Sequence, residues 1–100
     1  MKLKVLAHAR SGDKGDHANI GVIARDDAAF ERLERELTED RVADYFAGLK
    51  PSKVERFKMP GIKAFNFLLH NALGGGGSRS LRIDSQGKTL ATVILEMEIE

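Results

Sequence analysis

Two runs of alternating apolar and polar residues, separated by one short polar segment, constrain this chain more than any other feature. The first run covers residues 3–10 and the second covers residues 18–25. Such alternation places every second side chain on the same face, which is typical of a half-buried β-strand. The segment RSGDKGDH that joins them predicts a direct strand-to-strand connection, in which Gly12 and Gly15 supply positive φ angles.

Helical spacing follows this pair of strands. Asp26 or Asp27 is a suitable N-cap for a first helix, and Thr38 is a suitable N-cap for a second. Weaker alternation over residues 54–59 predicts a third strand, because a Pro-Gly pair ends the run directly afterwards.

The last third of the chain predicts one helix and two strands. Apolar residues recur at helical spacing over residues 62–73, and Gly74 is a natural stop for that helix. A fourth strand is expected around residues 81–83, followed by a hairpin turn at residues 84–87. Clean alternation over residues 89–99 predicts the final strand.

The predicted order of elements is therefore β-β-α-α-β-α-β-β, in a single domain that spans residues 1–100. One hundred residues, of which 42% are apolar, suffice for one modest hydrophobic core. Helices grouped on one face of a mainly antiparallel sheet form a two-layer α+β sandwich, which is the fold class that we expect.

Charge balance and missing residue types exclude several classes of protein. A net charge of +1 argues against a dedicated nucleic-acid binder and against a polybasic membrane anchor. Without cysteine, the chain has no disulfide, thiolate zinc site, iron–sulfur cluster or cysteine nucleophile. No apolar run approaches the ~18 residues of a membrane-spanning helix, and the first residues do not resemble a signal peptide. We therefore expect a cytoplasmic protein with neither nucleic acid nor a membrane as its partner.

The polar segment at residues 10–17 combines carboxylates, bases, a hydroxyl group and an imidazole. A Walker-type phosphate loop is excluded because the spacing differs and the next element is a strand. A weaker backbone nest, helped by Arg10 and Lys14, stays open. A Ser–His–Asp relay through Ser11 lacks the G-x-S-x-G elbow that would support it. A purely structural connection is the competing interpretation.

A metal loop is not favoured in the same segment. Asp13, Asp16, His8 and His17 carry suitable ligand atoms, but Lys14 separates the two acids. The calcium-loop pattern D-x-[DN]-x-[DN]-G is also absent. We therefore expect no resident metal and no cofactor.

Two further polar features have both a structural and a functional interpretation. The glycine run at residues 74–77 is either a flexible connection or a mobile flap, with Arg79 and Arg82 supplying positive charge. Asn66 and His70 share one side of the predicted helix, which is either a solvated stripe or a surface that orients a ligand.

Two long segments identify a family. The stretches ARSGDKGDHANIGVIAR and VERFKMPGIKAFNFLLHNALGGGGSRSLRIDSQGK resemble the small domain that closes acyclic terpene utilisation (AtuA-type) proteins. The resemblance implies a ferredoxin-like topology, and a module that follows a much larger domain or occurs as a separate short chain beside it. It also implies a setting in the breakdown of acyclic terpenoids and branched acids through CoA thioesters.

The resemblance assigns no catalytic role to any residue. The positions that match the family motif are Arg10, Ser11, Gly12, Asp13, Lys14, Gly15, Asp16, Asn19, Gly21, Pro60, Asn66, Gly75, Gly76, Asp84, Gly87 and Lys88. We take as ligand-binding candidates Arg10, Ser11, Gly12, Asp13, Lys14, Gly15, Asp16, Asn19, Asn66, Gly75, Gly76 and Arg82.

Three hypotheses about function follow. The first is an accessory subunit without catalysis of its own, which docks on a large AtuA-type chain or self-associates and contributes to an acyl-CoA or organic-acid site. The second is a small enzyme that acts on a CoA ester or carboxylic acid, with Asp13 or Asp16 as general base and Lys14 or Arg10 holding the anion. The third is a homo-oligomeric scaffold, a dimer or larger, without catalysis.

Overall fold

The computed structural model describes residues 1–14, 17–71 and 90–99, with the side chains of residues 13 and 14 left out. Within these ranges, one antiparallel sheet has the strand order β1-β2-β4-β3. Its strands are β1 (Ala7–Lys14), β2 (His17–Ala24), β3 (Lys53–Met59) and β4 (Ala64–His70). The helices are α1 (Leu3–Leu6), α2 (Asp27–Glu36), α3 (Glu39–Tyr45) and α5 (Leu90–Ile94), with short 3₁₀ turns η1 (Ala47–Leu49) and η2 (Pro60–Ile62).

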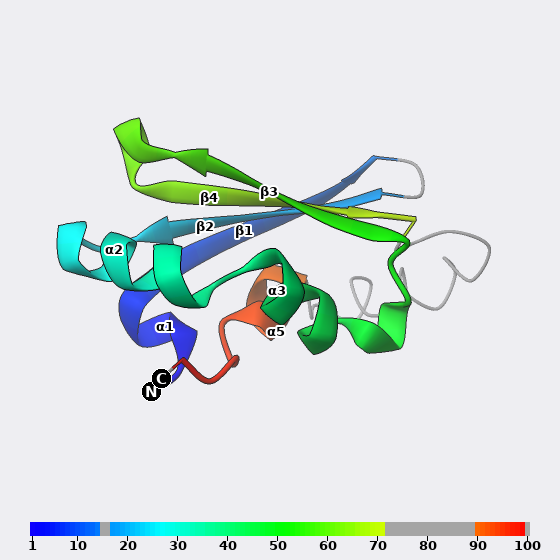
Figure 1. The fold of residues 1–100 in the computed structure, drawn as a ribbon, viewed down its shortest axis with the longest axis horizontal. Coiled ribbons are helices and arrows are strands. Elements are labelled where there is room, and N and C mark those ends of the chain that lie inside the picture. The colour runs from blue at the N-terminus through cyan, green and yellow to red at the C-terminus, as the bar shows by residue number, and fades with distance from the viewer. Residues whose placement is uncertain (15–16, 72–89, 100) are drawn as a thin grey trace.

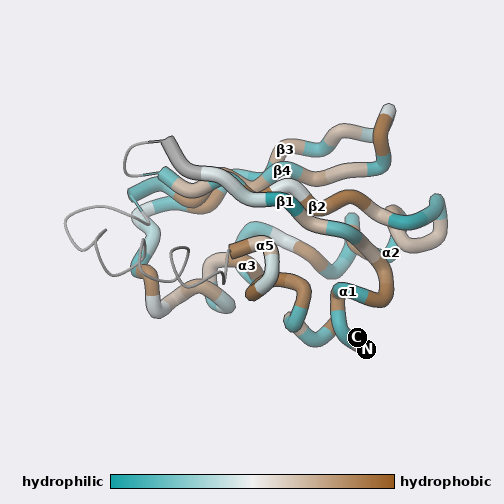
Figure 2. The backbone as a smooth tube through the Cα atoms, turned by 180° about the vertical axis from the view of Figure 1, so that it is seen from behind, coloured by the Kyte–Doolittle hydropathy of each residue, from teal (hydrophilic) through white to brown (hydrophobic). Residues whose placement is uncertain are grey.

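The helices lie on one side of the sheet, so the molecule has two layers (Figure 1). The view from behind shows the same layers, with the two chain termini side by side (Figure 2). The predicted α+β sandwich with an antiparallel sheet is therefore confirmed. Among the described residues, no helix is long and apolar enough to cross a membrane.

The core fills the space between the two layers. Phe65 and Phe67 of β4 are fully buried there, together with Ile20 and Val22 of β2. Leu33 of α2 closes the core from the helical side. In β2, burial alternates strictly from one residue to the next, so one face of the strand packs on helices and the other does not.

The predicted polar loop is mostly strand. The pairs between β1 and β2 run from Ala7↔Ala24 as far as Lys14↔His17, so only residues 15–16 lie between the two strands. The prediction of two strands joined directly is confirmed, but the polar segment belongs to their paired ends. Gly12 pairs with Asn19 within the ladder and does not adopt a positive φ, so the prediction that it supplies one is wrong. Both residues lie on the side of the sheet that no described helix covers.

The first strand also begins later than the alternation predicts. Residues 3–6 form α1 instead, and Leu3 is fully buried while Val5 is 58% exposed. The backbone N–H groups of Leu3 and Lys4 donate to the carbonyls of Met97 and Leu95, at 2.8 and 3.0 Å. The start of the chain therefore packs on its end, which the local pattern does not reveal.

The predicted helix over residues 62–73 is wrong, because residues 64–70 form the central strand β4. Phe65, Phe67 and Leu69 are fully buried and alternate with half-buried residues, which is the period of a strand. Helical and strand periods coincide at Phe65 and Leu69, but only a strand also buries Phe67. Backbone pairing with β2 on one side and β3 on the other decides between them.

The predicted final strand over residues 89–99 is also wrong. Residues 90–94 form α5, and Leu90, Ala91 and Ile94 face the core on one side of it. After this helix, a single bridge pairs Glu98 with Lys2. The described order is thus α-β-β-α-α-β-β-α in place of the predicted order. The fourth strand predicted around residues 81–83 and the turn at 84–87 lie outside the described residues.

Both predicted helix caps are confirmed. A side-chain oxygen of Asp26 accepts a hydrogen bond from the backbone N–H of Ala29 at 2.8 Å, at the start of α2. The hydroxyl of Thr38 accepts from the backbone N–H of Arg41 at 3.2 Å, at the start of α3. Each bond satisfies a donor that the first helical turn leaves without a partner.

Candidate functional site

The site that gathers most of the described candidate residues is the face of the sheet opposite the helices. We call this the open face. Its members alternate with the buried residues along each strand, and they are Arg10, Gly12, His17, Asn19, Gly21, Ile23, Glu55, Phe57, Met59, Asn66, Leu68 and His70. His8 lies at its border, where its Nε2 is 3.0 Å from an Nη of Arg25.

One row of the open face runs straight across the sheet through Gly21. Gly21 pairs with Arg10 of β1 on one side and with Asn66 of β4 on the other. A Cβ at Gly21 would lie 3.8 Å from Oδ1 of Asn66 and 3.9 Å from the carbonyl oxygen of Arg10. Because Gly21 has no side chain, the surface between the two polar side chains is a shallow depression, which we call the glycine floor. A glycine inside a strand often marks a bulge or a close backbone approach. The ladder is regular at Gly21, so neither feature occurs here.

A second row lies one pleat further along the strands. There Gly12 pairs with Asn19, which in turn pairs with Leu68 of β4. No heavy atom lies within 4 Å of the position that a Cβ of Gly12 would take. The two glycines thus keep the centre of the open face low, with amide and guanidinium groups around it.

Three polar side chains surround this floor: Arg10, Asn19 and Asn66. We call them the polar trio. None of the three makes a hydrogen bond or ion pair with another residue in the described part of the chain. Within the described ranges, their donors and acceptors are therefore not used by the fold. The sheet brings together four of the predicted ligand-binding residues, namely Arg10, Gly12, Asn19 and Asn66.

Ser11 faces the other way. Its hydroxyl accepts a hydrogen bond from the backbone N–H of Ala91 at 3.1 Å, near the start of α5. Because this bond joins β1 to a helix in the second layer, it accounts for Ser11 as a structural residue. The structure therefore separates Ser11 from the polar trio.

The remaining candidates have limited or no structural description. Asp13 pairs with Ala18 and Lys14 pairs with His17, but only through the backbone. The predicted site residues outside the described part of the chain are Gly15, Asp16, Gly75, Gly76 and Arg82. Their roles stay predictions.

One end of the open face carries two histidines and a carboxylate. Nε2 of His70 is 2.6 Å from Oε1 of Glu55, and the rings of His17 and His70 lie 5.1 Å apart, edge to face. The hydrogen bond with His70 holds the pKa of Glu55 below its ordinary value of 4.5, and the charge of Lys53 acts in the same direction. Glu55 is therefore ionised at neutral pH.

The sequence pattern does not point to Glu55, and it offers His17 only as a metal ligand that the spacing does not favour. The signal that finds them is the strand period: once residues 64–70 are read as a strand, His70 shares a face with Asn66. Glu55 then reaches that face through the β3–β4 hairpin. Reading the same residues as a helix hides both relationships.

Beyond Glu55, the open face of β3 becomes apolar, beginning with Phe57, which pairs with Asn66. Phe57 is 45% exposed and Met59 is 42% exposed, both on the open face of β3. Ile62, in the turn that follows, is 62% exposed. The open face therefore combines a charged end, the polar trio and, on β3 beyond Glu55, an exposed apolar end, and this mixture is typical of protein interfaces.

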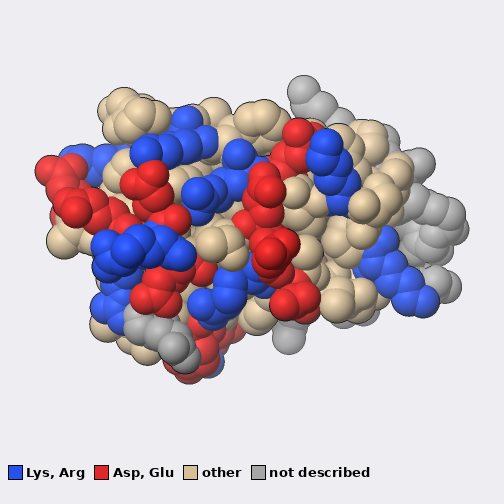
Figure 3. Space-filling model, viewed as in Figure 1, with Lys and Arg blue, Asp and Glu red and all other residues tan. Residues whose placement is uncertain are grey.

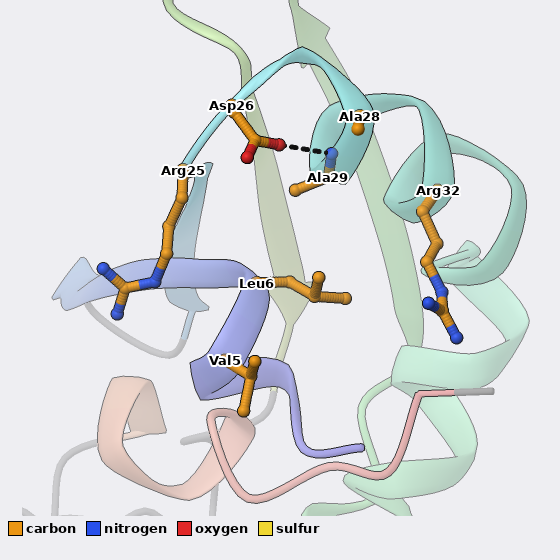
Figure 4. A pocket seen from close by; sticks show the side chains of 7 residues that line it. All are labelled: Val5, Leu6, Arg25, Asp26, Ala28, Ala29 and Arg32. Atoms are coloured by element: carbon orange, nitrogen blue, oxygen red, sulfur yellow. Dashed lines mark hydrogen bonds between the residues drawn. The ribbon is translucent and has the colours of Figure 1, made fainter.

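A small pocket between α1 and α2 has a different character (Figure 4). Val5 and Leu6 form its apolar side, and Arg32 stands on the opposite side. The guanidinium of Arg25 bonds to His8 and to the carbonyl oxygen of Lys4, and the Asp26 carboxylate caps α2. Since Arg25 and Asp26 are engaged within the fold, we assign no ligand to this pocket.

Arg56 lines a shallow groove beside α3. Like Arg25, it is engaged in hydrogen bonds within the fold. Its guanidinium donates to the carbonyl oxygens of Glu34 and Leu37, at 3.1 and 2.9 Å, which closes the end of α2. Its backbone N–H donates to a carboxylate oxygen of Glu39 at 2.8 Å. Arg56 therefore connects α2 and α3 to the edge strand β3.

Opposite charges alternate over the surface seen in Figure 3. Lys58 pairs with Glu34, and Lys2 and Lys4 both pair with Glu96 at 2.8 and 3.0 Å. No large patch of one sign lies on this face.

The fold and site together define an α+β domain whose sheet leaves one mixed polar and apolar face free of described helices. A family model, the AtuA ferredoxin-like domain, matches residues 1–100. The chain belongs to this family, as its sequence resemblance predicts. Neither the curated proteins nor the solved structures contain a match to it.

Proposed function

We propose that the chain is an accessory domain of an AtuA-type system, which docks through its open face on a large AtuA-type chain. Together the two would hold an acyl-CoA or organic-acid ligand, in the breakdown of acyclic terpenoids and related branched acids. The observation that carries this proposal is the polar trio, whose three side chains surround a glycine floor without partners among the described residues.

The chemistry of the open face suits an anionic ligand held at a protein interface. A guanidinium such as that of Arg10 binds carboxylate or phosphate oxygens through two parallel hydrogen bonds. Asn19 and Asn66 each offer both a donor and an acceptor. The exposed Phe57 and Met59 supply apolar area of the kind that is enriched in interface cores. One surface therefore provides both specificity and contact area.

Co-purification tests the docking step. A large AtuA-type chain encoded beside this one is co-expressed with the tagged domain, and the complex is measured at micromolar concentration. Arg10→Ala should reduce the captured large chain, whereas Arg35→Ala, at an exposed position on α2, should leave it unchanged. Absence of any complex, with or without CoA esters, would contradict the proposal.

Calorimetry tests the ligand step separately. Isovaleryl-CoA is titrated into the complex, into the isolated domain, and into a complex that carries Asn66→Ala. Binding should be strongest to the unmodified complex and weaker with the variant. If the complex forms but Asn66→Ala binds this probe as tightly as the original, docking stands and the ligand role of the polar trio fails.

Self-association is a second candidate, favoured by the exposed apolar end of the open face. Light scattering after size-exclusion chromatography measures the mass of the isolated domain and of Met59→Glu. A dimer that Met59→Glu dissociates would support a scaffold built through this face. A monomer at every concentration tested would exclude it.

A further inference from the structure

The hydrogen bond of His70 fixes which of its ring nitrogens carries the proton. Glu55 is ionised and can only accept, so Nε2 of His70 must donate to its Oε1 across 2.6 Å. In the neutral ring the other nitrogen, Nδ1, then keeps its lone pair. Nδ1 has no hydrogen-bond donor among the described residues. His70 therefore presents a free acceptor.

His17 is fixed in the opposite sense. The backbone N–H of Asn71 donates to Nδ1 of His17 at 3.1 Å, so in the neutral ring the proton is on Nε2. Asn71 reaches this position because it adopts a left-handed backbone, with φ of 58°, which asparagine tolerates better than most residues. Nε2 of His17 bonds to no other described residue, so His17 presents a free donor.

The end of β4 that carries these rings is held in place. The carbonyl oxygen of His70 accepts from the backbone N–H of Ser52 at 2.9 Å and from its hydroxyl at 3.3 Å. The side-chain amide of Asn71 donates to the same hydroxyl at 2.8 Å. This network holds the backbone that carries His70, whose ring centroid lies 5.1 Å from that of His17, and such support is the kind of preorganisation that a site requires.

The two rings, whose centroids lie 5.1 Å apart, present one donor nitrogen and one acceptor nitrogen. A hydroxyl group, which itself both donates and accepts, is complementary to such a pair. We propose that His70 and His17 form a site that binds and deprotonates a hydroxyl group, of water or of an alcohol. The hydroxyl donates to Nδ1 of His70 and accepts from Nε2 of His17. Glu55 is the positioning residue, because it orients the His70 ring and balances the charge that this ring acquires.

The proton transfer balances without a further reactant. The O–H bond of the ligand breaks, an N–H bond forms at Nδ1 of His70, and the electron pair stays on the ligand oxygen. When the hydroxyl is that of water and the probe is an activated ester, this oxygen forms a bond to the acyl carbon. The bond from that carbon to the leaving oxygen breaks, and the proton on His70 is released to solvent. The step needs only the isolated chain, so it does not depend on the proposed docking.

Hydrolysis of 4-nitrophenyl acetate by the isolated chain tests the site. His70→Gln should lower the rate by at least about tenfold, in line with the loss of a general base. His17→Gln should lower it less. His8→Gln is the matched control, because the chain has three histidines and His8 bonds instead to Arg25 outside this cluster. Equal rates for His70→Gln and His8→Gln would overturn the proposal.

A second measurement reads the role of Glu55 directly. At a pH where both rings are neutral, nitrogen NMR of the imidazoles should show the proton on Nε2 of His70 and on Nε2 of His17 in the unmodified chain. Glu55→Leu, which removes the acceptor, should abolish the preference of His70 while leaving that of His17, with amide spectra that show an intact fold. A preference of His70 that survives Glu55→Leu would overturn the positioning role, even if the ester assay cannot be read because a variant is unstable.

Discussion

Neighbouring residues in the family motif face opposite sides of one sheet. Arg10 lies on the open face without a partner among the described residues, whereas the next residue, Ser11, bonds to the backbone of α5. The pleat of the strand makes this division, because successive side chains point to opposite faces. A motif that is continuous in sequence is thus divided between one residue that holds the fold and one whose side chain bonds to no other residue in the described part of the chain.

Gly21→Ala tests fold stability and binding separately at a single position. An added Cβ would make ordinary contacts of 3.8 and 3.9 Å, so we expect the fold to keep its stability or to gain up to about 1 kcal/mol from reduced freedom of the unfolded chain. The same methyl group fills the floor between Arg10 and Asn66, so docking or ligand binding should weaken. Chemical denaturation and the co-purification assay measure the two effects, and a stable variant that docks normally would show that the floor is not used.

At the scale of elements, some structures follow from neighbouring residues, whereas others depend on contacts with distant parts of the chain. The paired strands near the start and both helix caps are encoded by neighbouring residues, so local rules predict them. Residues 64–70 carry helical and strand periods at once, and only the strands on either side decide between them. Residues 90–94 alternate as a strand would, yet they form a helix that packs beside β1. The candidate site follows the same division, since Arg10 and Asn66 can be named from sequence but their shared face cannot.

Two substitutions distinguish the observed strand β4 from the helix that the sequence pattern predicts. Phe67 is fully buried, although it lies off the predicted helical stripe, so Phe67→Ala should cost about 3–5 kcal/mol. Ile62 belongs to that stripe but is 62% exposed, so Ile62→Ala should change stability by about 0.5 kcal/mol or less. Urea denaturation measures both, and the reverse order of costs would contradict the register of β4.

At the scale of the whole molecule, carboxylates link distant parts of the chain and make stability depend on pH. Hydrogen bonds with lysines lower the pKa of Glu34 and of Glu96, and the bond with His70 lowers that of Glu55, each from an ordinary 4.5. A group whose pKa is lower in the folded state stabilises folding above its unfolded pKa. That stabilisation is lost as the pH falls through the folded value.

We therefore expect the urea midpoint to be level near neutrality and to fall as the pH drops below about 4.5. Glu96→Gln should be less stable than the original chain at pH 7 and should lose less on acidification, because Gln at this position does not titrate. Glu31→Gln, at an exposed position on α2 for which no ion pair is described, is the control. Equal acid sensitivity of the original chain and Glu96→Gln would contradict this account.

The two ends of the chain are fastened to each other. The amino group of Met1 donates to the carbonyl oxygen of Ile99 at 2.9 Å, and the backbone N–H of Ile99 donates back to Met1 at 2.7 Å. A domain with adjoining ends can be inserted into a surface loop of another chain without stretching either side of that loop. It can equally be closed into a ring by a short linker and reopened elsewhere. Because the two ends adjoin, a larger protein could contain this domain wherever two points of its own backbone lie close together.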